Sequence, residues 1–82
     1  MNTTIMAIAL EARNRFAPNL QEMLTKHGCI ISMRLGLHET SKALCAERGL
    51  ILLQLCGEEE EVSALKKDLS TIEGIKVNTM SI

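Results

Sequence analysis

The chain has 82 residues, with nine Lys and Arg against ten Asp and Glu, a formal net charge of −1. This length allows a single domain, 1–82. Without a basic excess, and with Phe16 as the sole aromatic residue, the chain lacks what direct nucleic-acid binding requires. Three cysteines without close spacing favour a reducing compartment, and the apolar run 5–10 is too short to span a membrane. We therefore expect a cytoplasmic protein without membrane contact.

The first half of the chain predicts a strand, a helix and a second strand. Residues 3–12 form the first strand, because the run 5–10 is apolar without helical spacing. Pro18 suits the first turn of the helix, and Gly28 is expected to end it in the left-handed conformation. Residues 29–37 then alternate with a period of two. One face carries Cys29, Ile31, Met33, Leu35 and Leu37, and the other carries Ile30, Ser32, Arg34 and Gly36.

The second half predicts the same order after a loop at 38–48. Residues 49–56 form the most apolar strand, with apolar side chains on both of its faces. The acidic run 58–61 opens a second helix, because carboxylates are stabilised at the positive end of the helix dipole. The apolar stripe of that helix consists of Val62, Leu65, Leu69 and Ile72. Gly74 turns the chain into a last strand, 75–82.

Two consecutive strand–helix–strand units predict an α+β, ferredoxin-like βαββαβ fold. Its four-stranded antiparallel sheet carries both helices on one face, and the opposite face stays uncovered. Because the strand 49–56 is apolar on both sides and needs cover on that face, the chain is expected to self-associate, face to face or edge to edge. The sequence therefore predicts a homodimer or higher homo-oligomer. We place Ile30, Arg34, Leu50 and Leu52 at the interface.

Arg13, Asn14 and Arg15 precede the predicted first helix. Two guanidinium groups near the free backbone N–H groups at the start of a helix favour the binding of a small anionic ligand. Arg34 is a further candidate to bind this ligand. The alternative is that these arginines are solvated. His38 and Cys45 are a weaker candidate pair of metal ligands, because no Cys-x2-Cys spacing accompanies them. The alternative is that both are ordinary loop residues. No cofactor is expected, and no catalytic motif surrounds any nucleophile or acid–base pair, which predicts a non-catalytic protein.

Several short segments resemble one known family. They are 34–37 (RLGL), 47–51 (ERGLI), Gly57, the spacing of Val62, Leu65 and Leu69, and 74–77 (GIKV). Together they resemble the small regulators of iron-only hydrogenase systems, which are similar to ACT domains and to the C-terminal domain of a nickel-responsive repressor. The resemblance runs over about residues 5–82. It implies a ferredoxin-like fold, oligomers and a regulatory or ligand-sensing role in the cytoplasm of an anaerobic bacterium.

The resemblance does not extend to the nickel site, which uses a His-x-His pair followed by a cysteine. Glu39 and Thr40 follow His38 here, so nickel binding is not expected. Because the first strand already belongs to the sheet, contact with DNA is expected to come through a DNA-binding or maturation partner. The sequence thus favours a regulatory or small-molecule-sensing domain. The alternatives are a metal-responsive sensor with His38 and Cys45 from neighbouring subunits, and an adaptor whose uncovered face docks on another polypeptide.

Overall fold

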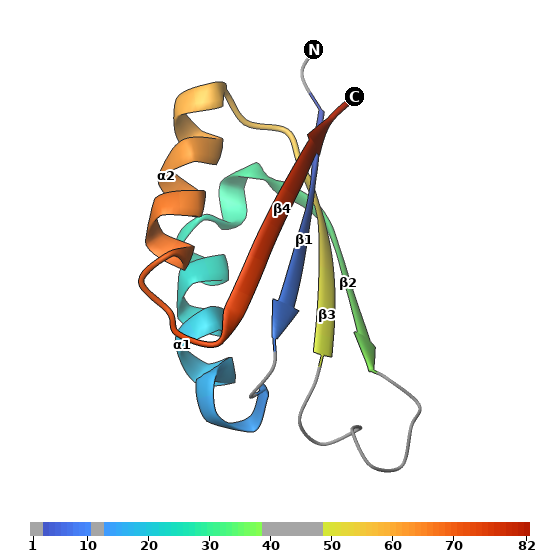
Figure 1. Cartoon of the computed structure of the whole chain (residues 1–82). Helices are drawn as coiled ribbons and strands as arrows, with labels where there is room; N and C mark the ends of the chain where they lie inside the picture. The colour runs from blue at the N-terminus through green and yellow to red at the C-terminus, as the bar shows by residue number, and fades with distance from the viewer. Residues whose placement is uncertain (1–2, 11–12, 39–48) are drawn as a thin grey trace.

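The computed structural model describes residues 3–10, 13–38 and 49–82, with the backbone alone for 13–17, 37 and 38. The elements follow in the order β1 (Thr4–Leu10), α1 (Arg13–Lys26), η1 (Gly28–Ile30, a 3-10 turn), β2 (Ile31–His38), β3 (Gly49–Leu55), α2 (Glu59–Leu69) and β4 (Ile75–Ser81). The strands form one sheet in the order β2-β3-β1-β4, and each neighbouring pair is antiparallel. Both helices lie on one side of it (Figure 1). This is the predicted ferredoxin-like α+β fold.

The hydrophobic core lies between the two helices and the sheet. Alternation along β1 and β3 turns every second side chain toward the helices, and each helix contributes one apolar stripe. The buried side chains are Met6, Ile8, Leu10, Leu20, Leu24, Ile30, Leu53, Leu55, Leu65, Leu69 and Ile72. The predicted stripe of the second helix is therefore confirmed at Leu65 and Leu69, with Val62 partly buried near the N-terminal end. Ile72 is buried as well, but it lies in the turn after α2.

The first helix differs from its prediction at both ends. α1 begins at Arg13, so Pro18 lies inside it, where its missing N–H removes one intrahelical hydrogen bond. At the other end, Gly28 starts the turn η1 and does not adopt a positive φ. The left-handed glycine of the described chain is Gly74, at φ 83°, in the turn between α2 and β4. The chain therefore leaves α1 through a 3-10 turn, not through a left-handed cap.

The second helix begins as its acidic run predicts. Glu58 is the N-cap, and its backbone N–H donates a hydrogen bond of 2.9 Å to Oε1 of Glu61. The side chain of Glu58 in turn accepts from the backbone N–H of Glu61, which completes a capping box. Two backbone donors that have no partner within the helix are thereby satisfied, and α2 starts at a defined residue.

A β-bulge in β2 overturns the predicted assignment of its faces. Ile31 pairs with Leu55, but Met33 pairs with Gln54, so Ser32 is an extra residue in the ladder. One extra residue reverses which face the following side chains occupy. Arg34 consequently pairs with Leu53 and belongs to the helix side of the sheet, not to the uncovered face. Ile30 was also misplaced: it lies in η1 and is buried in the core.

A small charged cluster joins the two helices. His27 Nε2 donates a hydrogen bond of 2.7 Å to Asp68 Oδ2, and Lys26 Nζ lies 3.1 Å from the same oxygen. His27 follows α1, whereas Asp68 lies in the last turn of α2. The hydrogen bond from His27, followed by that from Lys26, lowers the pKa of Asp68 below its ordinary value. The carboxylate is thus held in its charged form between the helices.

The depressed pKa of Asp68 predicts a loss of stability in acid. Its stabilising contribution is present above the pKa of an unfolded aspartate, about 4, and is lost as the pH falls through the lower folded value. We expect the difference in free energy of unfolding between the wild type and Asp68→Asn to shrink as the pH falls from 7 to 2. Urea unfolding at both pH values measures this difference. A constant difference would contradict the role of the charged carboxylate.

Candidate functional site

Two surfaces of the sheet are candidates for function, and the first is the face turned away from the helices. Because Met6, Ile8 and Leu10 point into the core, their neighbours Ile5, Ala7 and Ala9 point the other way. The pairing register extends this set across all four strands. We define the open face by Ile5, Ala7, Ala9, Met33, Leu35, Leu50, Leu52, Gln54, Lys76, Asn78 and Met80.

The open face is apolar over most of its width. Met33, Leu35 and Met80 are 51%, 48% and 59% exposed. Leu50 and Leu52 lie between them, partly buried, on the face where the sequence placed them. Polar side chains interrupt this surface at Gln54, near one end of β3, and along β4. An exposed apolar surface that crosses a whole sheet is typical of a protein–protein contact.

The residues predicted to bind an anion are placed in two separate elements. Arg13, Asn14 and Arg15 form the first turn of α1, where the backbone alone is described. Arg34 lies in the middle of the edge strand β2 and is exposed. The anion site at the start of α1 therefore stays a prediction, and the corrected register takes Arg34 away from the open face.

The predicted metal pair falls largely outside the described residues. His38 is the last residue of β2, described by its backbone only, and Cys45 lies outside the described residues. Within residues 3–10, 13–38 and 49–82, no three His, Cys, Asp or Glu side chains gather where they could hold a metal ion. In the same part of the chain, no helix is long and apolar enough to cross a membrane.

The second surface is a groove between α2 and β4 that the sequence did not reveal. Two hollows, of about 360 and 390 Å³, follow the seam between this helix and this strand. Lys66 borders both of them, so they meet at its side chain. All the helix-side residues of β4 line one hollow or the other: Ile75, Val77, Thr79 and Ser81. We call this surface the α2–β4 groove.

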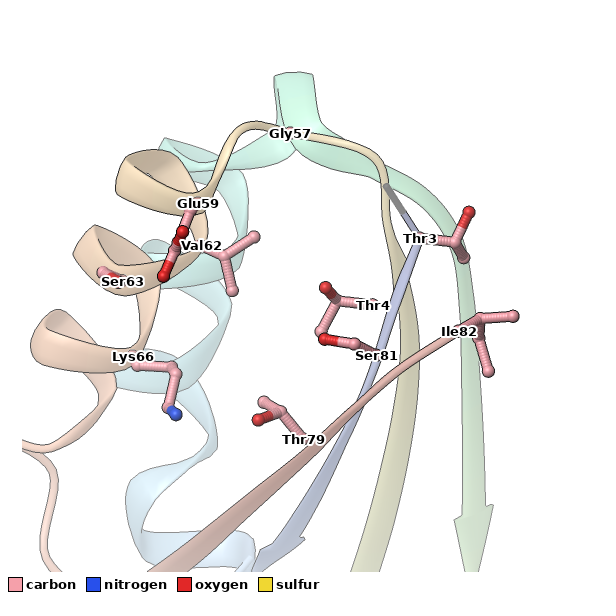
Figure 2. A pocket seen from close by; sticks show the side chains of 10 residues that line it. All are labelled: Thr3, Thr4, Gly57, Glu59, Val62, Ser63, Lys66, Thr79, Ser81 and Ile82. Atoms are coloured by element: carbon pink, nitrogen blue, oxygen red, sulfur yellow. The ribbon is translucent and has the colours of Figure 1, made fainter. Parts of the chain in front are cut away.

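The α2–β4 groove changes in character along its length. At one end, Leu69, Ile72, Ile75 and Val77 make it apolar. At the other end, its walls carry the hydroxyl groups of Thr4, Ser63, Thr79 and Ser81, with Glu59 near the start of α2. Figure 2 shows Thr79 and Ser81 pointing from β4 toward α2, from which Lys66 extends into the same space. The groove therefore combines an apolar end, one cation and a hydroxyl-rich end that also carries one carboxylate.

One sequence signal could have indicated this groove. Every second residue of β4 faces the helices, and these residues change from Ile75 and Val77 to Thr79 and Ser81. A core-facing strand normally keeps apolar residues on its buried face. The change to threonine and serine indicates that the last part of this face is not covered, but which helix flanks it depends on the tertiary fold.

Comparison with known proteins finds similarity at the level of the fold. No protein-family model matches the chain, and no curated protein matches its sequence. The uncharacterized protein TM1266 from Thermotoga maritima superposes with a TM-score of 0.84 and 23% identity, over 100% of this chain and 99% of that one. Part of a formyltetrahydrofolate deformylase from Pseudomonas putida also matches, with a TM-score of 0.57 and 11% identity over 95% of this chain and 28% of that one.

A third similar structure is the apo form of CPII from Thiomonas intermedia, a nitrogen regulatory PII-like protein. It matches with a TM-score of 0.64 and 17% identity, over 100% of this chain and 90% of that one. The form of CPII bound to ADP, AMP and bicarbonate matches with a TM-score of 0.55 and 17% identity, over 100% of this chain and 91% of that one. These comparisons establish that the chain has the fold of small ferredoxin-like proteins.

Proposed function

We propose that this protein is a non-catalytic regulatory domain that senses a small molecule and works as a homo-oligomer. The observation that carries the proposal is the open face, whose exposed Met33, Leu35 and Met80 flank the partly buried Leu50 and Leu52. Burying apolar surface contributes about 25 cal/mol per Å². A standard interface buries about 800 Å² on each partner, so a second copy seated on the open face would stabilise the assembly substantially.

The kind of assembly follows from the composition of the open face. Its centre carries short and branched aliphatic side chains from β1 and β3, and its polar residues include Lys76 and Asn78 on the edge strand β4. An apolar centre with polar groups at its margin is the usual anatomy of a protein interface. Two identical faces can meet about a twofold axis, which is the commonest symmetry of soluble oligomers.

The regulatory part of the proposal rests on the fold and on the family resemblance. CPII, which shares the fold, is a nitrogen regulatory PII-like protein that has been solved with ADP, AMP and bicarbonate. The segments of this chain that resemble regulators of iron-only hydrogenase systems favour the same class of role. We therefore propose a small anionic ligand near Arg13, Asn14 and Arg15, and regulation of an iron-only hydrogenase system through a DNA-binding or maturation partner.

The assembly is tested by sedimentation equilibrium of the wild type and two variants. Leu35→Glu places a carboxylate on the open face, and burying an unpaired charge at an interface is costly. We expect this variant to weaken association by at least roughly a hundredfold. Thr25→Glu is the matched control, because it adds the same charge on the exposed side of α1. A wild type that sediments as a monomer at micromolar concentration would refute the proposed assembly.

Ligand sensing is tested on the same wild-type protein by thermal unfolding with nucleotides, amino acids and small carboxylates. A ligand at one hundred times its Kd stabilises the folded state by about 2.7 kcal/mol. For a domain of this size, that corresponds to a rise in Tm of roughly 10 °C or more. A screen in which no such compound raises the Tm would count against a sensing role and leave the assembly result unaffected.

A further inference from the structure

The outer edge of β4 presents backbone groups that no other strand uses in the described structure. β4 is the last strand of the sheet and pairs only with β1. The backbone N–H of Ile82 donates a hydrogen bond of 2.9 Å to the carbonyl oxygen of Thr3. Hydrogen-bonding residues alternate along an antiparallel pair. The N–H and C=O groups of the intervening residues therefore point outward, at Ile75, Val77, Thr79 and Ser81.

These four residues also line the α2–β4 groove with their side chains. A segment that formed a strand beside β4 would thus extend the sheet and at the same time direct every second side chain into the groove. Strand addition next to a side-chain groove is a recurring mode of peptide recognition. Seven residues of β4 provide an edge of about 20 Å at 3.3 Å per residue, which is long for a small metabolite and suits an extended peptide.

The two edges of the sheet are not equally open to strand addition. The β2 edge is interrupted by the bulge at Ser32, and Arg34 lies beside it. Bulges and charged residues are devices that protect edge strands from pairing. β4 also carries one charged residue, Lys76, on the open face, but it keeps an unbroken register with β1 from Ser81 to Ile75 and contains neither a bulge nor a proline. β4 is therefore the edge at which another strand can pair.

We propose that β4 and the α2–β4 groove bind an extended peptide segment of a partner protein by strand addition. Lys66 selects an acidic side chain in the middle of that segment. It borders both hollows, and none of the ion pairs among the described residues includes it. The groove-facing side chain two positions away is apolar, because Leu69, Ile72 and Ile75 surround that end. This surface goes beyond the proposed function, which uses the open face.

Charge argues for a partner peptide over a second copy of the chain. If two β4 strands paired about a twofold axis at their midpoint, Asn78, each Lys66 would approach the axis from its own side. Like charges placed close together at an interface are unfavourable. A segment that carries a carboxylate at this place instead complements the charge of Lys66. The groove therefore fits a peptide with one acidic side chain beside Lys66, away from Glu59, better than it fits β4 of another copy.

The test begins with random nine-residue peptides displayed for selection on the full-length protein. Enriched peptides are then measured for affinity and for amide hydrogen exchange on the protein. We expect enriched sequences to place an acidic residue two positions from an aliphatic one. Binding should slow exchange of the outward amides at Val77 and Thr79, because they gain hydrogen bonds. The inward amides of Lys76 and Asn78 should change little, because they already pair with β1.

Two variants assign the binding to the proposed contacts. Lys66→Glu should lower the affinity for the enriched acidic peptides at least tenfold. Lys67→Glu makes the same charge change at a residue that lines neither hollow, and it should leave the affinity within about twofold of the wild type. Thr79→Pro removes one outward N–H and leaves the β1 ladder intact, so it should abolish binding while circular dichroism is retained. If this variant fails to fold, the comparison of Lys66→Glu with Lys67→Glu still tests whether the peptides bind in the α2–β4 groove.

Several results would overturn the proposal. One is that no peptide is enriched, and another is that enriched peptides protect the amides of β2 instead of β4. A third is that Lys66→Glu and Lys67→Glu change the affinity for the peptides equally. Slow exchange at Val77 and Thr79 in the free protein would show that another copy already covers the edge. None of these results depends on whether Leu35→Glu dissociates the assembly, so the two proposals fail separately.

Discussion

Replacing Leu65 with alanine is expected to lower the free energy of unfolding by about 3 kcal/mol. Leu65 is fully buried, at 0% exposure, in the middle of α2 and belongs to the core beneath the sheet. Alanine removes its transfer free energy and leaves a cavity in the core, whose other buried members include Leu69, Met6 and Ile8. The free energy of unfolding of a small domain is only about 5–15 kcal/mol. This single substitution therefore removes a large part of the stability of the protein.

Urea unfolding followed by far-ultraviolet circular dichroism measures this effect. The experiment is best done in the Leu35→Glu background, because the stability of an oligomer depends on protein concentration. Lys67→Ala is the control on the same helix, where the side chain is exposed and the change should stay within about 0.5 kcal/mol. A loss below about 1 kcal/mol for Leu65→Ala would mean that α2 does not pack on the sheet as described, and the α2–β4 groove would lose its wall.

Replacing Gly57 with alanine is expected to cost about 2 kcal/mol through overpacking. A methyl group at this position would lie 2.5 Å from Cγ2 and 2.9 Å from Cβ of Ile30, and 3.2 Å from Cβ of Glu61. Ile30 cannot move away easily, because it is buried in the core. The backbone N–H of Cys56 also donates a 2.8 Å hydrogen bond to the carbonyl oxygen of Ile30, which holds the two segments together.

Gly36→Ala is the matched control for this prediction. Gly36 lies in β2, and a methyl group added there meets nothing within 4 Å. Its effect on the free energy of unfolding should stay within about 0.5–1 kcal/mol. The same urea experiment compares both variants. If Gly57→Ala were as mild as Gly36→Ala, the close approach of Gly57 to Ile30 would be wrong, and with it the angle at which the chain enters α2.

Local patterns in the sequence predicted most of the secondary structure and the fold. Each of these patterns lies within a single element: the apolar run in β1, and the acidic start and the spacing of Leu65 and Leu69 in α2. These patterns act through the alternation of side chains along a strand, helix capping and the burial of one helix stripe. All three effects depend on neighbours only a few residues away. The order of these elements then left a ferredoxin-like sheet as the simplest way to bury their apolar faces.

The prediction of the faces of β2 failed because the deciding contact joins residues distant in the chain. The bulge at Ser32 reverses the faces of β2, and it exists because Ile31 and Met33 pair with consecutive residues of β3, more than twenty positions away. The start of α1 at Arg13 was missed because a proline at the sixth helical residue was assigned to the first turn. Because of the bulge, Arg34 lies on the face opposite to the predicted one, whereas Leu50 and Leu52 lie on the open face, as their predicted place at the interface requires.

From the amino-acid order alone one could infer the number and kind of elements, the helix stripes and an uncovered apolar face, because periodicity records which side of each element avoids water. The α2–β4 groove and the free edge of β4 became visible only in three dimensions. They arise where Lys66 and Thr79 come from elements that no local pattern connects. Which strand ends at an edge, and which helix lies beside it, is set by the packing of the whole chain.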